Sequence, residues 1–243
     1  MPYRRLPNTD NARLKALQTA LSKGKEIPPF KLAFTQKSFQ KTQAFLTRFE
    51  KAILLHKQAQ SRQVKNNKEY QKVLKKAKLF LSHFIQVMNM AITRSELPAS
   101  TRISFGINED DKSLPVLVSE KDIIYWGKKL LEGESSRALL GRTPITNPTI
   151  AVVKVRYEQF LEAQRFQQIL KEKNIRALEK LSALRDEANE IILNIWNEVE
   201  SSYKDLPDNL KRERGKEYGL VYIYRKNEID QVNFHDSRQK DTG

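Results

Sequence analysis

The sequence predicts a mostly α-helical fold. We expect an antiparallel four-helix bundle of two long α-hairpins, with a short extra helix and a minor two-stranded β element. Apolar residues recur at spacings of three and four over two long stretches, as in helices that bury one face. The 243 residues include only 8 Gly and 9 Pro, which disfavours a fold with many tight turns. Residues 81–98 also align with 190–207, and both segments end in Leu-Pro, which favours a repeated hairpin.

Residues 1–34 are predicted to form a basic arm followed by a short helix. The arm contains two prolines and shows no helical periodicity. Thr9 or Asp10 is a suitable cap for the helix, because short polar side chains accept hydrogen bonds from the first turn. We expect this helix to end near Ser22, since Gly24 and a pair of prolines follow.

A single helical-bundle domain is predicted over residues 35–225, and its first hairpin spans 35–96. Asn66-Asn67 is the only break in the apolar pattern, so the joint between the two helices is placed there. The apolar positions of the two helices are Phe39, Thr42, Leu46, Phe49, Ile53 and His56, then Leu74, Ala77, Leu81, Phe84, Met88 and Ala91.

An insertion is predicted over residues 97–146, between the two hairpins. It contains a short strand candidate at 102–105 and a helix over about 120–133. Ser119 and Asp122 have the spacing of a capping box, in which each side chain binds the backbone N–H of the other residue. That pattern marks the start of the helix.

The second hairpin is predicted over residues 147–206. Asn147-Pro148 favours a helix start, because it supplies a cap residue and then proline at the first helical position. Asn174 is a weak joint between the two helices. An uninterrupted helix over 148–204 is the alternative, because neither Gly nor Pro marks a turn near this joint.

The C-terminal part contains a short strand, predicted over residues 219–225. Its β-branched and aromatic residues are typical of strands. We expect it to pair with 102–105, because a lone strand would leave its backbone groups without hydrogen-bond partners. Residues 226–243 are polar and are predicted to be a disordered tail.

The net charge of +15 is concentrated in the first part of the chain. Residues 1–96 hold 20 Lys+Arg and 5 Asp+Glu, whereas 97–243 hold 24 of each. Such asymmetry indicates a polyanionic partner, although a basic face that serves only solubility is the alternative. The candidate nucleic-acid-binding residues are Arg4, Arg5, Lys37, Lys41, Lys51, Arg62, Lys65, Lys72, Lys75 and Lys76.

Several kinds of chemistry are disfavoured by the residues present. The chain contains no cysteine, which excludes disulfides, thiolate nucleophiles and cysteine metal sites. Neither His56 nor His83 has a glutamate three residues before it, as the di-metal sites of helical bundles require. The glycine-rich loops that bind nucleotide phosphates are missing. We therefore predict a protein that is not an enzyme and needs neither cofactor nor metal.

Two classes of function lead, ahead of peripheral membrane binding, which would need an exposed apolar face beside the lysines. The first is a binding protein that engages nucleic acid or a ribonucleoprotein through its basic N-terminal half. The alternative is a structural or interaction protein that binds an acidic protein or assembles with copies of itself. The most apolar stretch, 79–92, is too short for a membrane span, and no secretory signal opens the chain. A cytoplasmic location is therefore expected.

Four stretches of the sequence are distinctive. They are the opening PYRRLPNTD, RSELP at 94–98, Trp126-Gly127, and KLSALRDEANEIILNIWNE at 180–198. Across nearly the whole chain, the protein resembles an uncharacterised family of mostly helical Bacteroidota proteins. The resemblance implies a free-standing bacterial protein, and it implies no activity, cofactor or binding residue.

Overall fold

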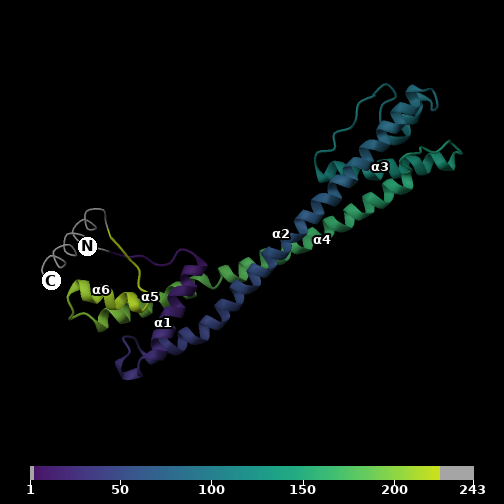
Figure 1. Cartoon of the computed structure of the whole chain (residues 1–243). Coiled ribbons are helices and arrows are strands. Elements are labelled where there is room, and N and C mark those ends of the chain that lie inside the picture. The colour runs from purple at the N-terminus through teal and green to yellow at the C-terminus, as the bar shows by residue number, and fades with distance from the viewer. Residues whose placement is uncertain (1–2, 225–243) are drawn as a thin grey trace, which may run out of the picture. The chain divides into compact units, whose positions relative to one another are not determined.

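The computed structural model describes residues 3–224, so the predicted disordered tail at 226–243 lies outside the described residues. The described chain is mostly α-helical, which confirms the predicted fold class (Figure 1). Its α-helices are α1 (Asp10–Glu26), α2 (Gln36–Thr93), α3 (Glu120–Leu139), α4 (Ile150–Ser182), α5 (Arg185–Ser202) and α6 (Asp208–Glu217). Two 3-10 helices, η1 (Pro29–Lys31) and η2 (Ala99–Phe105), and two strands, β1 (Tyr3–Arg4) and β2 (Tyr222–Ile223), complete the fold.

The described chain divides into two compact units, in place of the single domain predicted over 35–225. Residues 3–58 and 175–224 form one, here called the terminal unit, and Ala59–Asn174 form the other, here called the middle unit. Each unit has its own hydrophobic core. Helices α2 and α4 each contribute residues to both units.

The predicted first hairpin at 35–96 is wrong, because α2 continues without a joint at Asn66-Asn67. Partners on α4 satisfy the amides that suggested a break. The Asn66 side chain donates a hydrogen bond of 2.7 Å to Gln167, and Gln167 donates one of 3.4 Å to Asn67. Neither Gly nor Pro interrupts the backbone there, so the helix has no reason to end.

The predicted second hairpin at 147–206 is also wrong, because the joint predicted at Asn174 does not exist. Helix α4 runs through Asn174, whose side chain donates a hydrogen bond of 2.8 Å to Gln63 on α2. The break comes later, at 183–184, where α4 gives way to α5. The helix also begins at Ile150 rather than at Pro148, because Asn147 has a positive φ of 55° that belongs to a turn. Without hairpins, the predicted four-helix bundle is not confirmed.

The small β element exists, but the predicted partner strand is wrong. Residues 102–105 belong to η2, and β2 pairs instead with β1 in an antiparallel sheet. The side chain of Arg102 is buried and donates hydrogen bonds to Asn89 and to the backbone oxygen of Glu109. A strand in this place would leave that guanidinium without its partners.

The terminal unit packs α1, α5 and α6 together, as Figure 1 shows. Of the two predicted cap residues, Thr9 caps α1 by accepting a hydrogen bond from the Ala12 backbone, and Asp10 is the first residue of the helix. The helix continues to Glu26 instead of ending near Ser22. Gly24 lies inside the helix, and the ring of Phe39 occupies the space where a Cβ would be. Helix α6 was not expected, since its sequence contains only one apolar side chain.

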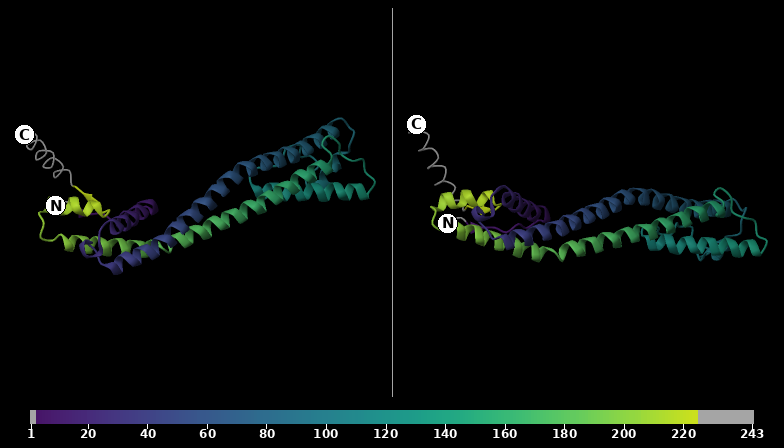
Figure 2. Two further views of the ribbon diagram at one scale, coloured as in Figure 1. Left: turned by 60° about the horizontal axis from the view of Figure 1, so that its bottom comes forward. Right: turned by 90° about the horizontal axis from the view of Figure 1, so that it is seen from below.

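The middle unit packs α3 alongside α2 and α4 (Figure 2). Ser119 and Asp122 form the predicted capping box at the start of α3. The ring of Phe105 meets that of Phe84 edge-on, with 5.8 Å between the ring centroids. Gly127 lets the ring of Tyr157 lie directly against α3. The Tyr157 hydroxyl then donates a hydrogen bond of 3.1 Å to the backbone oxygen of Ile124.

Gly127→Ala is expected to destabilise the middle unit by about 1–3 kcal/mol, the usual cost of overpacking a core. The added methyl group would overlap the ring of Tyr157 and displace its hydroxyl from Ile124. Helix propensity alone predicts the opposite sign, because alanine is favoured over glycine by about 1 kcal/mol within helices. Urea denaturation followed by circular dichroism measures the sign of the change in unfolding free energy. A variant as stable as the parent protein, or more stable, would contradict the packing argument.

Candidate nucleic-acid interface

The structure distributes the basic residues of the N-terminal half over both units. The middle unit contains 20 Lys+Arg and 12 Asp+Glu, and the described part of the terminal unit contains 20 and 13. Each unit therefore carries a positive net charge of similar size. What differs between them is how that charge is placed and whether carboxylates neutralise it locally.

In the middle unit the excess charge lies on one segment of α2. Residues 62–78 contain seven Lys+Arg and one acidic residue, whereas the rest of the unit is nearly neutral. All seven side chains are exposed. We call this set the basic row; it consists of Arg62, Lys65, Lys68, Lys72, Lys75, Lys76 and Lys78.

The helical repeat explains why these side chains face solvent. Tyr70 and Ala77 lie seven residues apart and are buried, with exposed fractions of 4% and 0%. Residues at spacings of three and four on the opposite side of the helix must then point outward, and Lys65, Lys72 and Lys75 occupy such positions. At 1.5 Å per residue, the segment from 62 to 78 extends for about 24 Å along the axis of α2.

Most of the basic row is free of ion pairs within residues 3–224. Lys72 pairs with Glu69 one turn away, at 2.8 Å, and both side chains are well exposed. The other six form no ion pair or side-chain hydrogen bond with another residue that the structure describes. A phosphate approaching this face would therefore not have to displace a carboxylate, except at Lys72.

The basic candidates of the terminal unit have more acidic surroundings. Lys37, Lys41 and Lys51 are exposed, but α5 carries acidic residues beside this stretch of α2. Arg48 pairs with Glu187 at 2.7 Å. Glu198 accepts hydrogen bonds of 2.6 Å from the Ser38 hydroxyl and 2.6 Å from the backbone of Thr35. Carboxylates close to lysines weaken the attraction of that surface for another anion.

The two arginines of the predicted basic arm also belong to the terminal unit. Arg4 lies in β1 and pairs with Glu200 at 3.4 Å, and Glu200 also accepts a hydrogen bond from Tyr222. Arg5 is exposed beside a cleft next to α1.

Of the ten candidate residues, the structure therefore groups five in the basic row: Arg62, Lys65, Lys72, Lys75 and Lys76. The sequence argument missed Lys68 and Lys78, although both belong to the same charge run.

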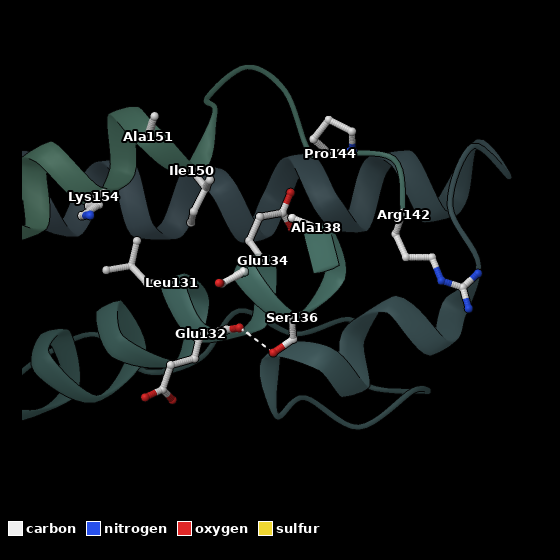
Figure 3. Close-up of a pocket in the computed structure, with 11 residues that line it drawn as sticks. Leu131, Glu132, Glu134, Ser136, Ala138, Arg142, Pro144, Ile150, Ala151 and Lys154 are labelled. Atoms are coloured by element: carbon white, nitrogen blue, oxygen red, sulfur yellow. Dashed lines mark hydrogen bonds between the residues drawn. The ribbon is translucent and has the colours of Figure 1, made fainter. Parts of the chain in front are cut away.

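A cavity of about 790 Å³ lies between α3 and α4 in the middle unit (Figure 3). Its buried carboxylate, Glu134, accepts hydrogen bonds from the Arg137 side chain at 3.1 Å and from the Ile145 backbone at 2.8 Å. Arg137 donates a further bond of 2.6 Å to the backbone oxygen of Thr143. The Ser136 hydroxyl donates to the backbone of Glu132 at 2.9 Å. The bonds of Glu134 and Arg137 hold the turn between α3 and α4 in place, whereas the Ser136 bond lies within α3.

Two further features were sought among the described residues: a cluster of metal ligands and a helix that could span a membrane. Within residues 3–224, no three side chains of His, Cys, Asp or Glu come together in an arrangement that would hold a metal ion. None of the helices in that range has both the length and the apolar content of a membrane span.

Comparisons with protein-family profiles, with curated proteins and with solved structures find no match for the chain. The resemblance to a Bacteroidota family accordingly stays a prediction. Function must be argued from the surface chemistry of the units themselves.

Proposed function

We propose that the protein is a non-enzymatic binding protein that engages nucleic acid, free or within a ribonucleoprotein, through the basic row of the middle unit. One observation carries the proposal: seven exposed Lys and Arg side chains lie on one segment of α2, and six of them have no ion-pair partner among the described residues. Clustered cations of this kind bind phosphate backbones, because each contact releases condensed counterions.

The chemistry of the row favours binding without sequence selection. Six of its seven members are lysines, which contact phosphate as point charges, whereas arginine is the usual side chain for reading guanine. Phosphate contacts fix the position of a protein on nucleic acid but carry no direct sequence information. We therefore expect similar affinities for oligonucleotides of different sequence at one salt concentration.

The dependence of affinity on salt tests this function. If six members of the row contact phosphate, the logarithm of the association constant should fall with the logarithm of the salt concentration at a slope of about −5 for duplex DNA. Fluorescence anisotropy with a labelled duplex of random sequence measures this slope. An affinity that stays constant between about 50 and 200 mM salt would contradict the proposal.

An interaction with an acidic protein, or with another copy of this chain, is the second candidate. It is favoured by apolar side chains on the same stretch of α2, since Val64 and Leu79 are 58% and 61% exposed. A protein partner buries such groups, whereas a phosphate backbone does not. Light scattering at low and high salt detects self-assembly. Competition by polyglutamate against the labelled duplex detects a general preference for acidic polymers.

A further inference from the structure

A cleft of about 570 Å³ lies in the terminal unit, between the N-terminal arm, α1 and the segment that leads into β2. Backbone pairing fixes its outer wall. Tyr3 and Arg4 pair with Ile223 and Tyr222, and the Arg5 backbone donates a hydrogen bond of 3.1 Å to Val221. The arm is therefore held beside the C-terminal segment by contacts that leave the side chain of Arg5 free.

Small residues make the floor of this cleft. Gly219 has a φ of +84°, and a Cβ at that position would lie 3.2 Å from the backbone oxygen of Ala16. Glycine is thus required both for the turn and for its close approach to α1. Ala12 and Ala16 face the same space from α1. With alanine and glycine at these places, side chains do not fill the gap between the helix and the sheet.

The walls of the cleft are apolar and its charged groups are all cationic. Apolar wall residues include Leu6, Pro7, Leu220, Val221 and Ile223, and the polar ones are Asn8 and Thr19. Its charged residues are Arg5, Lys15 and Lys216, and no acidic side chain lines it. The volume falls within the range of about 300–1,000 Å³ that is common for small-molecule sites.

The three cations of the cleft have no acidic partner among the described residues. Elsewhere in the terminal unit, Arg4 pairs with Glu200, Lys23 with Glu217, and Arg185 with Asp10. Arg5, Lys15 and Lys216, in contrast, form no ion pair with any residue that the structure describes. Unneutralised cations around an apolar space are complementary to a molecule that carries a negative charge on an apolar body.

We infer that this cleft binds a small ligand with an anionic head, a carboxylate or a phosphate, on an apolar chain. The head lies among Arg5, Lys15 and Lys216, where each cation donates hydrogen bonds to its oxygens. The chain lies on Ala16 and against Leu220 and Val221, where it leaves water. This inference is independent of the function proposed for the middle unit, because it uses residues of the terminal unit alone.

Anilinonaphthalene sulfonate, which has one anionic head on an apolar body, is a suitable probe for the full-length protein. We expect its fluorescence to rise with a single saturable site. Dodecanoate and dodecyl phosphate should both displace it, and the stronger of the two identifies the preferred head. Dodecyl maltoside, which has no charge, should displace it at least tenfold more weakly. Absence of saturable binding, or equal displacement by the neutral compound, would overturn the inference.

Matched variants locate the bound probe. Lys15→Gln combined with Lys216→Gln should weaken probe binding at least tenfold, and Ala12→Leu should weaken it by filling the cleft. Lys25→Gln combined with Lys31→Gln removes two exposed charges from the same unit outside the cleft, so it should bind like the parent protein. Circular dichroism confirms that each variant is folded. If the double variant retains the parent affinity, the cleft is not the site.

Discussion

Glu134→Ala is expected to lower the free energy of unfolding of the middle unit by about 3–5 kcal/mol, the usual cost of removing one partner from a buried ion pair. Glu134 and Arg137 are each only 4% exposed. Without the carboxylate, the guanidinium of Arg137 would remain buried without a counter-charge. The backbone N–H of Ile145 would also lose its acceptor. Urea denaturation of the parent protein and the variant measures the difference.

The same helix provides a control for this prediction. Glu132 pairs with Lys128 at 3.7 Å, and the two side chains are 57% and 71% exposed. Glu132→Ala should therefore change stability by no more than about 1 kcal/mol. Replacing both buried partners by apolar residues, Glu134→Leu with Arg137→Met, should cost less than Glu134→Ala, because no buried charge is left unpaired. A Glu134→Ala variant as stable as Glu132→Ala would refute the structural role assigned to this pair.

Changing Lys65, Lys72 and Lys75 together to glutamine is expected to reduce the slope of the salt dependence of duplex binding by about three. Each lysine that contacts phosphate contributes about 0.9 to that slope. At 0.15 M salt, the loss of three contacts corresponds to roughly a hundredfold weaker binding. Anisotropy titrations of the parent protein and the triple variant over a range of salt concentrations measure both quantities.

The terminal unit offers a control variant with the same change in net charge. Lys37, Lys41 and Lys51 are exposed residues of α2 outside the basic row, beside the acidic side chains of α5. Their change to glutamine should leave the slope almost unaltered, because the decisive contacts lie elsewhere. Equal losses in the two triple variants would show that net charge alone, and not the basic row, governs binding.

Local signals in the sequence were sufficient for several features. The capping box at Ser119 and the cap at Thr9 depend on residues three positions apart, so the sequence alone reveals them. The charge run on α2 is likewise local, and five members of the basic row were predicted from it. Exposure on a helix follows from its periodicity, which is why the row could be placed on the outer face without a structure.

Long-range partners explain what the sequence did not show. Asn66 suggested a joint because asparagine is a weak helix former, and its partner Gln167 lies 101 residues away. The sequence makes Arg4 a candidate phosphate contact, but Glu200, on α5, neutralises it. The strand partner of β2 is at the other end of the chain. No periodicity or spacing rule identifies such pairs in a single sequence.

The amide pairs between α2 and α4 in the middle unit also fix the alignment of these helices. Gln63 meets Asn174, and Asn66 meets Gln167. Within the middle unit, a displacement of α2 by one heptad along α4 would bring Asn66 against Phe160 in place of Gln167. A half-buried amide that loses its partner destabilises the interface, so misaligned arrangements are disfavoured. The asparagines that resemble a break in the sequence therefore select one antiparallel register among several that apolar packing alone would allow.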